Sequence, residues 1–187
     1  MKKLITNIQN IWKVEELRKR LIVTFSLILV FRIGSFVVLP GVDSSKLGTT
    51  ADAGTLEGLF GLLSGGGFTN ASFLALGIMP YISASIIMQL MGMAVPAVQK
   101  MQQEGESGRK RINYYTRLLT IIICAVQAPG YLTLYLGQKN AIPAEFVDSP
   151  LWWIQSVLVL VAGAMFSVWL GERITDRGVG DGISRLI

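Results

Sequence analysis

The stretch ASFLALGIMPYISASIIMQLMGM, residues 71–93, contains no charged side chain over 23 residues. A helix rises about 1.5 Å per residue and the hydrocarbon core of a bilayer is about 30 Å thick, so about 20 apolar residues are enough to cross it. Lipid offers the backbone no hydrogen-bond partner, which favours a helix over an isolated strand. This stretch therefore predicts a membrane-spanning helix.

Three further stretches have the same character, residues 21–39, 118–136 and 151–170, and Arg32 is the only charged residue in them. The whole chain is 51% apolar and 16% charged, whereas soluble domains contain about a quarter charged residues. The first stretch is too long for the apolar region of a signal peptide, and no small-residue cleavage site follows it. We therefore predict an all-α membrane protein with four transmembrane helices.

The basic residues indicate the orientation of these spans. The N-terminal segment 1–20, the loop 94–117 and the C-terminal segment 171–187 contain 14 of the 17 Lys and Arg residues. An even number of spans places both ends on one side of the membrane, and an excess of Lys and Arg marks the cytoplasmic side. We expect both ends to be cytoplasmic. This distribution explains the net charge of +5 without a nucleic-acid partner.

The loop 40–70 contains a short apolar stretch with helical spacing, too short to cross a membrane. Its apolar residues are Leu56, Leu59, Phe60, Leu62 and Leu63. Gly65, Gly66 and Gly67 follow as a hinge. Two interpretations remain open from the residues alone: a re-entrant half-helix packed inside protein, and an amphipathic helix on the outer surface.

The span 71–93 also has an unusual pattern. Ile78, Ile82 and Ile86 recur every four residues and form one ridge of a helix. Ser83 adds a polar group, and Pro80 is expected to interrupt the hydrogen-bond ladder in the middle of the span. Such a helix can line a pore with a hydrophobic constriction. The residues alone favour the simpler interpretation, a helix whose polar groups bond to neighbouring helices.

Three residues in the other spans are expected to be structural. Arg32 either reaches outward to the interface or faces the protein interior. The buried amide of Gln127 needs a partner, which a neighbouring helix can supply. Gly163 is small enough to allow close helix packing.

The residue inventory argues against an enzyme. The chain has no histidine and one cysteine, which excludes Ser-His and Cys-His nucleophile pairs and a His-based metal site. The four spans contain no Asp or Glu that could form the acidic pair of an intramembrane protease. We expect no catalytic residue, no metal and no cofactor.

Several longer strings resemble segments of the SecY family, in the same order and at similar spacing. They are FRIGSF at 31–36, LSGGG at 63–67, LALGIMPYISASIIMQL at 74–90, EGESGRKR at 104–111 and WLGERITDRGVGDGIS at 169–184. Asp181 stands where many members have Asn. The resemblance covers nearly the whole chain.

The resemblance implies a fold and a division of the chain. SecY has ten spanning helices in two halves of five, so this chain corresponds to the N-terminal half of the SecY fold without its fifth span. We expect a cytoplasmic amphipathic segment at 1–20, a transmembrane domain at 21–170 with a re-entrant plug helix at 56–64, and a cytoplasmic loop at 171–187 that leads to the fifth span.

The resemblance also implies site residues. It assigns Ile78 and Ile82 to the hydrophobic pore ring, and the short helix with Leu56, Leu59, Phe60, Leu62 and Leu63 to the plug. Ser83, Ile86 and Gln127 become candidates for the lateral gate, through which apolar segments leave the pore sideways.

The implied function is part of the channel that passes unfolded polypeptides across the bacterial plasma membrane and releases signal or transmembrane segments into it. Implied partners are the SecE and SecG subunits, the SecA motor or the ribosome, signal sequences, secretory polypeptides and membrane lipids, with no nucleic acid. The alternative is a small-solute transporter with broken helices, which Pro80 and Pro129 would fit.

Overall fold

The computed structural model describes residues 14–47, 58–59, 61 and 64–186. Over these residues the fold is helical, with one isolated antiparallel bridge between Val38 and Ser72 and no strand, as the predicted all-α class requires. The long helices are α2 (Glu15–Gly34), α4 (Met79–Ala94), α6 (Glu106–Gly130), its π-helical continuation η2 (Tyr131–Gly137) and α8 (Pro150–Arg177). The short ones are η1 (Ser44–Lys46), α5 (Pro96–Gln103), α7 (Ala144–Val147) and α9 (Gly182–Leu186).

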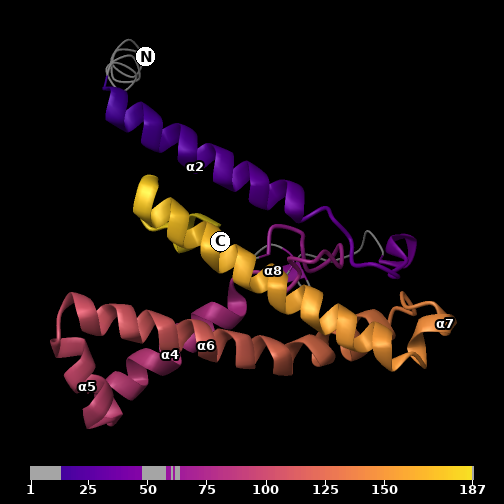
Figure 1. Ribbon diagram of the computed structural model, residues 1–187. Helices are drawn as coiled ribbons and strands as arrows, with labels where there is room; N and C mark the ends of the chain where they lie inside the picture. Colours follow the sequence, from indigo (N-terminus) through magenta and orange to yellow (C-terminus); the bar gives the residue numbers. More distant parts are fainter. Residues whose placement is uncertain (1–13, 48–57, 60, 62–63, 187) are drawn as a thin grey trace.

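Helix α8 is central to the arrangement, with α2 on one side and α6 on the other (Figure 1). Two described helices, Glu106–Gly137 and Pro150–Arg177, are long and apolar enough to cross a membrane. Helices α4 and α5 make a third only if they count as one broken span, because they meet at 101°. The apolar part of α2, residues 21–34, is shorter than a full span needs, and the chain continues without a helix to Leu39.

The expected span 71–93 is helical only from Met79 onward. Residues 71–78 form a series of turns, and Ala71 and Gly77 have positive φ values of 47° and 50°. Pro80 is compatible with the late start, because proline fits the first turn of a helix, where its missing N–H costs nothing. Our expectation that Pro80 interrupts the middle of this helix is therefore wrong.

Two apolar clusters hold the helices together. The larger one joins α6, η2 and α8 to the turns at 71–76; its fully buried members include Cys124, Ala128, Leu132, Leu136 and Leu160. The smaller one joins α2, the turns at 74–78, α8 and α9; its members are Phe31, Leu74, Ile78, Leu170, Ile174 and Leu186. The irregular segment before α4 thus lies between two cores and contributes to both.

Gly163 allows α8 to pass directly over that segment. A methyl group added at Gly163 would overlap the backbone carbonyl of Phe73 and its ring. Close packing at this glycine, expected from the sequence, is confirmed, although its partner is an irregular loop and not a second helix.

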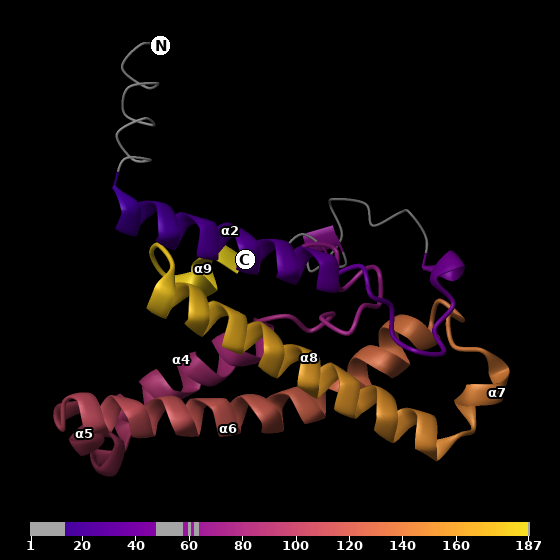
Figure 2. The same ribbon diagram turned by 45° about the horizontal axis from the view of Figure 1, so that its top comes forward.

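The structure gathers three basic segments at one end of the molecule. The start of α2, the α5–α6 region and the end of α8 lie together there, whereas η1 and α7 lie at the other end (Figure 2). Arg117 of α6 donates two hydrogen bonds to Glu172 of α8, of 2.9 and 2.6 Å, at the basic end. At the opposite end the Trp152 indole donates to the Pro40 carbonyl (3.0 Å).

The opposite end also contains a short turn that the Asp43 side chain stabilises. The hydroxyl and the backbone N–H of Ser45 both donate to the Asp43 carboxylate. These bonds, with a smaller contribution from nearby Lys46, lower the pKa of Asp43. Because the Asp43 N–H donates to the Ala141 carbonyl (2.9 Å), this turn joins the loop after α2 to the loop after η2.

Two side-chain hydroxyls hold the glycine-rich segment at 177–184. The Val179 N–H donates to the Thr24 hydroxyl of α2 (3.1 Å), and the Gly182 N–H donates to the Thr175 hydroxyl of α8 (2.9 Å). Helix α9 then folds back onto α8, where Ile183 packs against Gly171. The C-terminal segment therefore connects α2 to α8.

We predict that Gly163→Ala lowers the free energy of unfolding by about 1–3 kcal/mol, because the added methyl group pushes α8 away from the Phe73 carbonyl. Thermal unfolding of the purified protein in detergent measures the effect. Gly130→Ala is the matched control, since a methyl group there meets nothing within 4 Å. Equal stability of the two variants would contradict the close approach at Gly163.

Candidate functional site

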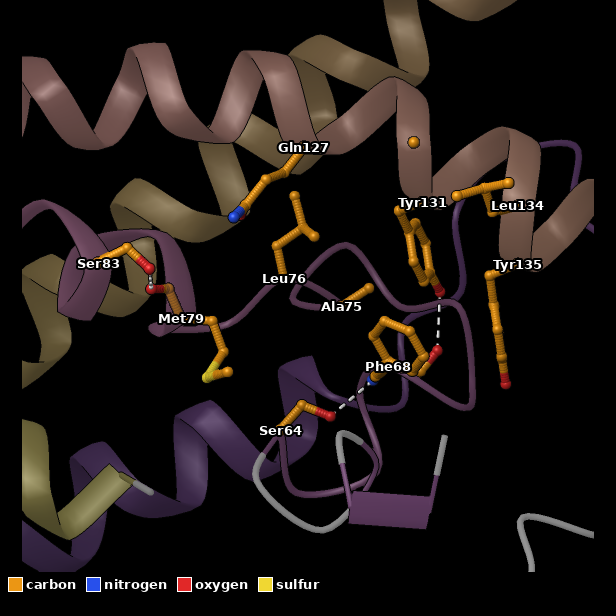
Figure 3. Close-up of a pocket in the computed structure, with 11 residues that line it drawn as sticks. Ser64, Phe68, Ala75, Leu76, Met79, Ser83, Gln127, Tyr131, Leu134 and Tyr135 are labelled. Atoms are coloured by element: carbon orange, nitrogen blue, oxygen red, sulfur yellow. Dashed lines mark hydrogen bonds between the residues drawn. The ribbon is translucent and has the colours of Figure 1, made fainter. Parts of the chain in front are cut away.

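An open groove of about 420 Å³ lies between α4, the α6–η2 junction and the irregular loop before α4 (Figure 3). The helices contribute Met79, Ser83, Gln127, Gly130, Tyr131, Leu134 and Tyr135, and the loop contributes Ser64, Phe68, Ala75 and Leu76. Most of this wall is hydrocarbon or aromatic ring. The groove can therefore accept apolar groups without a matching pattern of polar partners.

Three aromatic rings form one wall of the groove. The Phe68 ring lies 4.9 Å from the Tyr131 ring and 4.7 Å from the Tyr135 ring, between centroids, and the two tyrosines stack at 5.4 Å. Both tyrosines are buried, at 5% and 7% exposure. Their four-residue spacing in η2 places both rings on the same side of the helix, toward the loop.

The two tyrosine hydroxyls are bound to the backbone of that loop. Tyr131 donates to the Phe68 carbonyl at 2.7 Å, and Tyr135 donates to the Thr69 carbonyl at 3.4 Å. From the opposite side, the Arg32 guanidinium of α2 donates to the Gly65 carbonyl. Arg32 thus has the structural role that the sequence suggested, and its partner is a loop carbonyl.

The structure brings two of the three lateral-gate candidates to one groove. Ser83 and Gln127 both line it, from α4 and α6 respectively. The Ser83 hydroxyl donates to the Met79 carbonyl of its own helix (3.2 Å), and Gln127 is exposed. Ile86 does not line the groove and is 51% exposed on α4.

The two pore-ring candidates lie elsewhere. Ile78 precedes the first turn of α4 and is 5% exposed, in the smaller core with Phe31 and Leu170. Ile82 is half-buried and packs against the same cluster. Their assignment stays a prediction, and Ile78 has a packing role in addition.

Most plug candidates lie outside the described residues, namely Leu56, Phe60, Leu62 and Leu63, as does most of the expected N-terminal amphipathic segment. Leu59 is described, is helical and is 51% exposed. The glycine hinge after it is a tight turn in which Gly65 and Gly66 have φ values of 62° and 87°. Ser64, at its start, reaches the groove.

The sequence reasoning missed Phe68, Tyr131 and Tyr135. Two tyrosines four residues apart, directly after Pro129 and Gly130 in an otherwise aliphatic span, were a usable signal, because a phenolic hydroxyl within a span needs a partner. Among the described residues, no three His, Cys, Asp or Glu side chains lie close enough together to hold a metal ion.

Comparisons with known proteins agree on one family. The sequence model of the SecY family matches residues 72–187. Protein translocase subunit SecY of Vibrio cholerae is 44% identical over 174 residues, covering 92% of this chain and 39% of that protein. The same subunit of Escherichia coli K12 is 43% identical over 177 residues, covering 92% of this chain and 39% of that protein. The subunit of Buchnera aphidicola from Acyrthosiphon pisum is 42% identical over 191 residues, covering 100% of this chain and 44% of that protein.

A solved structure has the same fold. Sec61 in the canine ribosome-channel complex from the endoplasmic reticulum superposes with a TM-score of 0.62 at 21% identity, covering 90% of this chain and 35% of that one. The chain spans about two fifths of the length of the curated relatives that it matches.

Proposed function

The chain belongs to the SecY family, and from this premise we propose that it forms the N-terminal part of a protein-conducting channel. The complete channel would pass unfolded polypeptides across the bacterial plasma membrane and release apolar segments sideways into the lipid. Family membership and the apolar groove carry this proposal. They do not favour the alternative of a small-solute transporter, since the described part of the groove offers a solute few polar partners.

The groove is our candidate for this chain's share of the lateral gate. Its hydrocarbon wall would hold an apolar helix by contact and by release of water, which depend on area and not on sequence. Ser83 and Gln127 would add weak polar contacts that an entering segment can replace. This combination suits a gate that must accept many different signal segments and perform no chemistry on them.

We infer the remaining parts of the channel from family membership. Ile78 and Ile82 would belong to the pore ring, and residues 56–64 would form the plug. SecE, SecG and the SecA motor or the ribosome would be partners, and signal sequences and unfolded secretory polypeptides would be the passengers.

The proposed orientation places both ends in the cytoplasm. The described parts of the three basic segments lie at one end of the fold (Figure 2), and a high density of Lys and Arg favours the cytoplasmic side.

In intact cells, we predict that an impermeant maleimide labels Ser45→Cys and leaves Ser107→Cys unlabelled, in a full-length channel with Cys124 replaced by alanine. Both serines are exposed, and only the first lies on the proposed outer side. Labelling after the cells are opened is the control for reactivity. The reverse pattern in intact cells would overturn the orientation.

For the gate, we predict that a photo-crosslinking amino acid at Gln127 captures the signal segment of a stalled precursor in a full-length channel. The same amino acid at Val126 is the matched control, because Val126 is 74% exposed and does not line the groove. The crosslinking yield at Gln127 should exceed the yield at Val126 by roughly tenfold. Equal yields at the two positions would show that the groove is not part of the gate.

For the pore ring, Ile82 is the better test, because Ile78 is buried and its loss would also weaken the core. We predict that Ile82→Ser raises the ion current of the idle full-length channel, since a polar wall lowers the cost of wetting a narrow pore. The ion current of Ile82→Val should stay close to that of the parent. If Ile82→Ser conducted no more ions than the parent, Ile82 would not belong to the ring.

A further inference from the structure

Three side chains from two helices bond to the backbone of one irregular loop, residues 64–72. Arg32 of α2 binds the Gly65 carbonyl, and Tyr131 and Tyr135 of η2 bind the Phe68 and Thr69 carbonyls. Other hydrogen bonds of the loop are local or reach the chain before it: the Phe68 N–H donates to the Ser64 hydroxyl, and the Leu39 N–H donates to the Ala71 carbonyl. The tyrosine hydroxyls therefore donate hydrogen bonds that hold the loop against η2, in addition to the packing of the Phe68 ring on the two tyrosine rings.

The same residues line the groove. Ser64 and Phe68 of the loop face it together with both tyrosines (Figure 3). A group that enters the groove thus contacts both partners of the Tyr131–Phe68 hydrogen bond.

The groove is too small for a helix in its present shape. Its 420 Å³ equals roughly three benzene-sized cavities of about 150 Å³ each, whereas a helix with its side chains is about 10–12 Å wide. A helical segment can enter fully only if the groove widens, and widening between η2 and the loop lengthens the Tyr131–Phe68 hydrogen bond. The 2.7 Å bond from Tyr131 then breaks, because such a bond is lost beyond about 3.5 Å.

The junction of α6 and η2 is suited to this movement. Pro129 has no N–H to continue the helical ladder, and Gly130 has open space around its Cα. A hinge is common where proline or a π-helical turn interrupts a helix. Here both occur within three residues, because Pro129 is followed by a π-helix that begins at Tyr131.

We propose that Tyr131 and Tyr135 are positioning residues that latch the loop 64–72 to η2, and that an apolar segment entering the groove releases this loop. The inference rests on the proposed function for its occupant. The latch itself rests on the hydrogen bonds of Tyr131 and Tyr135 to the loop and does not depend on the proposed function. It connects the occupancy of the groove to the segment that follows the expected plug.

Hydrogen–deuterium exchange of the full-length channel in detergent tests the latch. Tyr131→Phe with Tyr135→Phe keeps the rings and removes the two hydroxyls, and it should speed exchange of residues 64–72 by about threefold to tenfold, the range for lost neutral hydrogen bonds. Thr133→Val is the matched control, because the Thr133 hydroxyl bonds only to carbonyls of its own helix. Unchanged exchange in the double phenylalanine variant would overturn the latch, as would equal acceleration in the control.

A second measurement tests the coupling. A synthetic 20-residue Leu/Ala peptide helix with two terminal lysines should speed exchange of residues 64–72 in the parent by a similar factor. In the double phenylalanine variant, the peptide should cause little further increase in this exchange rate. If the peptide crosslinks at Gln127 and leaves this exchange unchanged or slower, the coupling is wrong. If it fails to crosslink at Gln127, the assignment of the groove as a gate fails, and the latch is judged by the variant alone.

Discussion

The irregular backbone between Ser64 and Ile78 needs hydrogen-bond partners that a continuous helix would supply itself. Lipid supplies none, so non-helical chain at membrane depth is tolerated only where protein or a water-filled cavity surrounds it. Side chains from α2 and η2 supply donors to this segment, and the Leu39 N–H donates to the Ala71 carbonyl. Among the described residues that are not exposed, no buried side-chain nitrogen or oxygen is left without a partner.

This requirement shapes the helices around the segment. Helix α8 passes close to the Phe73 carbonyl because Gly163 has no side chain. Helix α4 begins at Met79, with Pro80 in its first turn. Leu74 and Ile78 fill the smaller core, while Ala71 and Ala75 belong to the larger one. One irregular stretch therefore sets the spacing of α2, α4, α6 and α8.

The groove follows from the same arrangement. A continuous helix over residues 71–93 would pack along α6, whereas the observed turns leave a cleft between α4 and η2 that the loop only partly fills. Its wall is apolar, and its few polar atoms bond mainly to the protein's own backbone. Such a surface can hold an apolar segment without a matching pattern of polar partners, as the proposed gate requires.

The sequence by itself determined the helical class, the apolar segments and their basic flanks, because these depend on the length of uncharged runs and on the distribution of Lys and Arg. The strings around GIMPYISASI identified the family. The family resemblance suggested one region for Ser83 and Gln127, and both residues line the groove.

Only the tertiary structure decided which polar groups meet. Three contacts join residues far apart in the chain: the hydrogen bond from Arg32 to Gly65 and those from the two tyrosines to Phe68 and Thr69. The burial of Ile78 against Phe31 and Leu170 is of the same kind. Hydrophobic periodicity indicates which side of each segment faces lipid or the protein core. It contains no information on which distant carbonyl a tyrosine hydroxyl or a guanidinium will reach, because that depends on how the segments pack together.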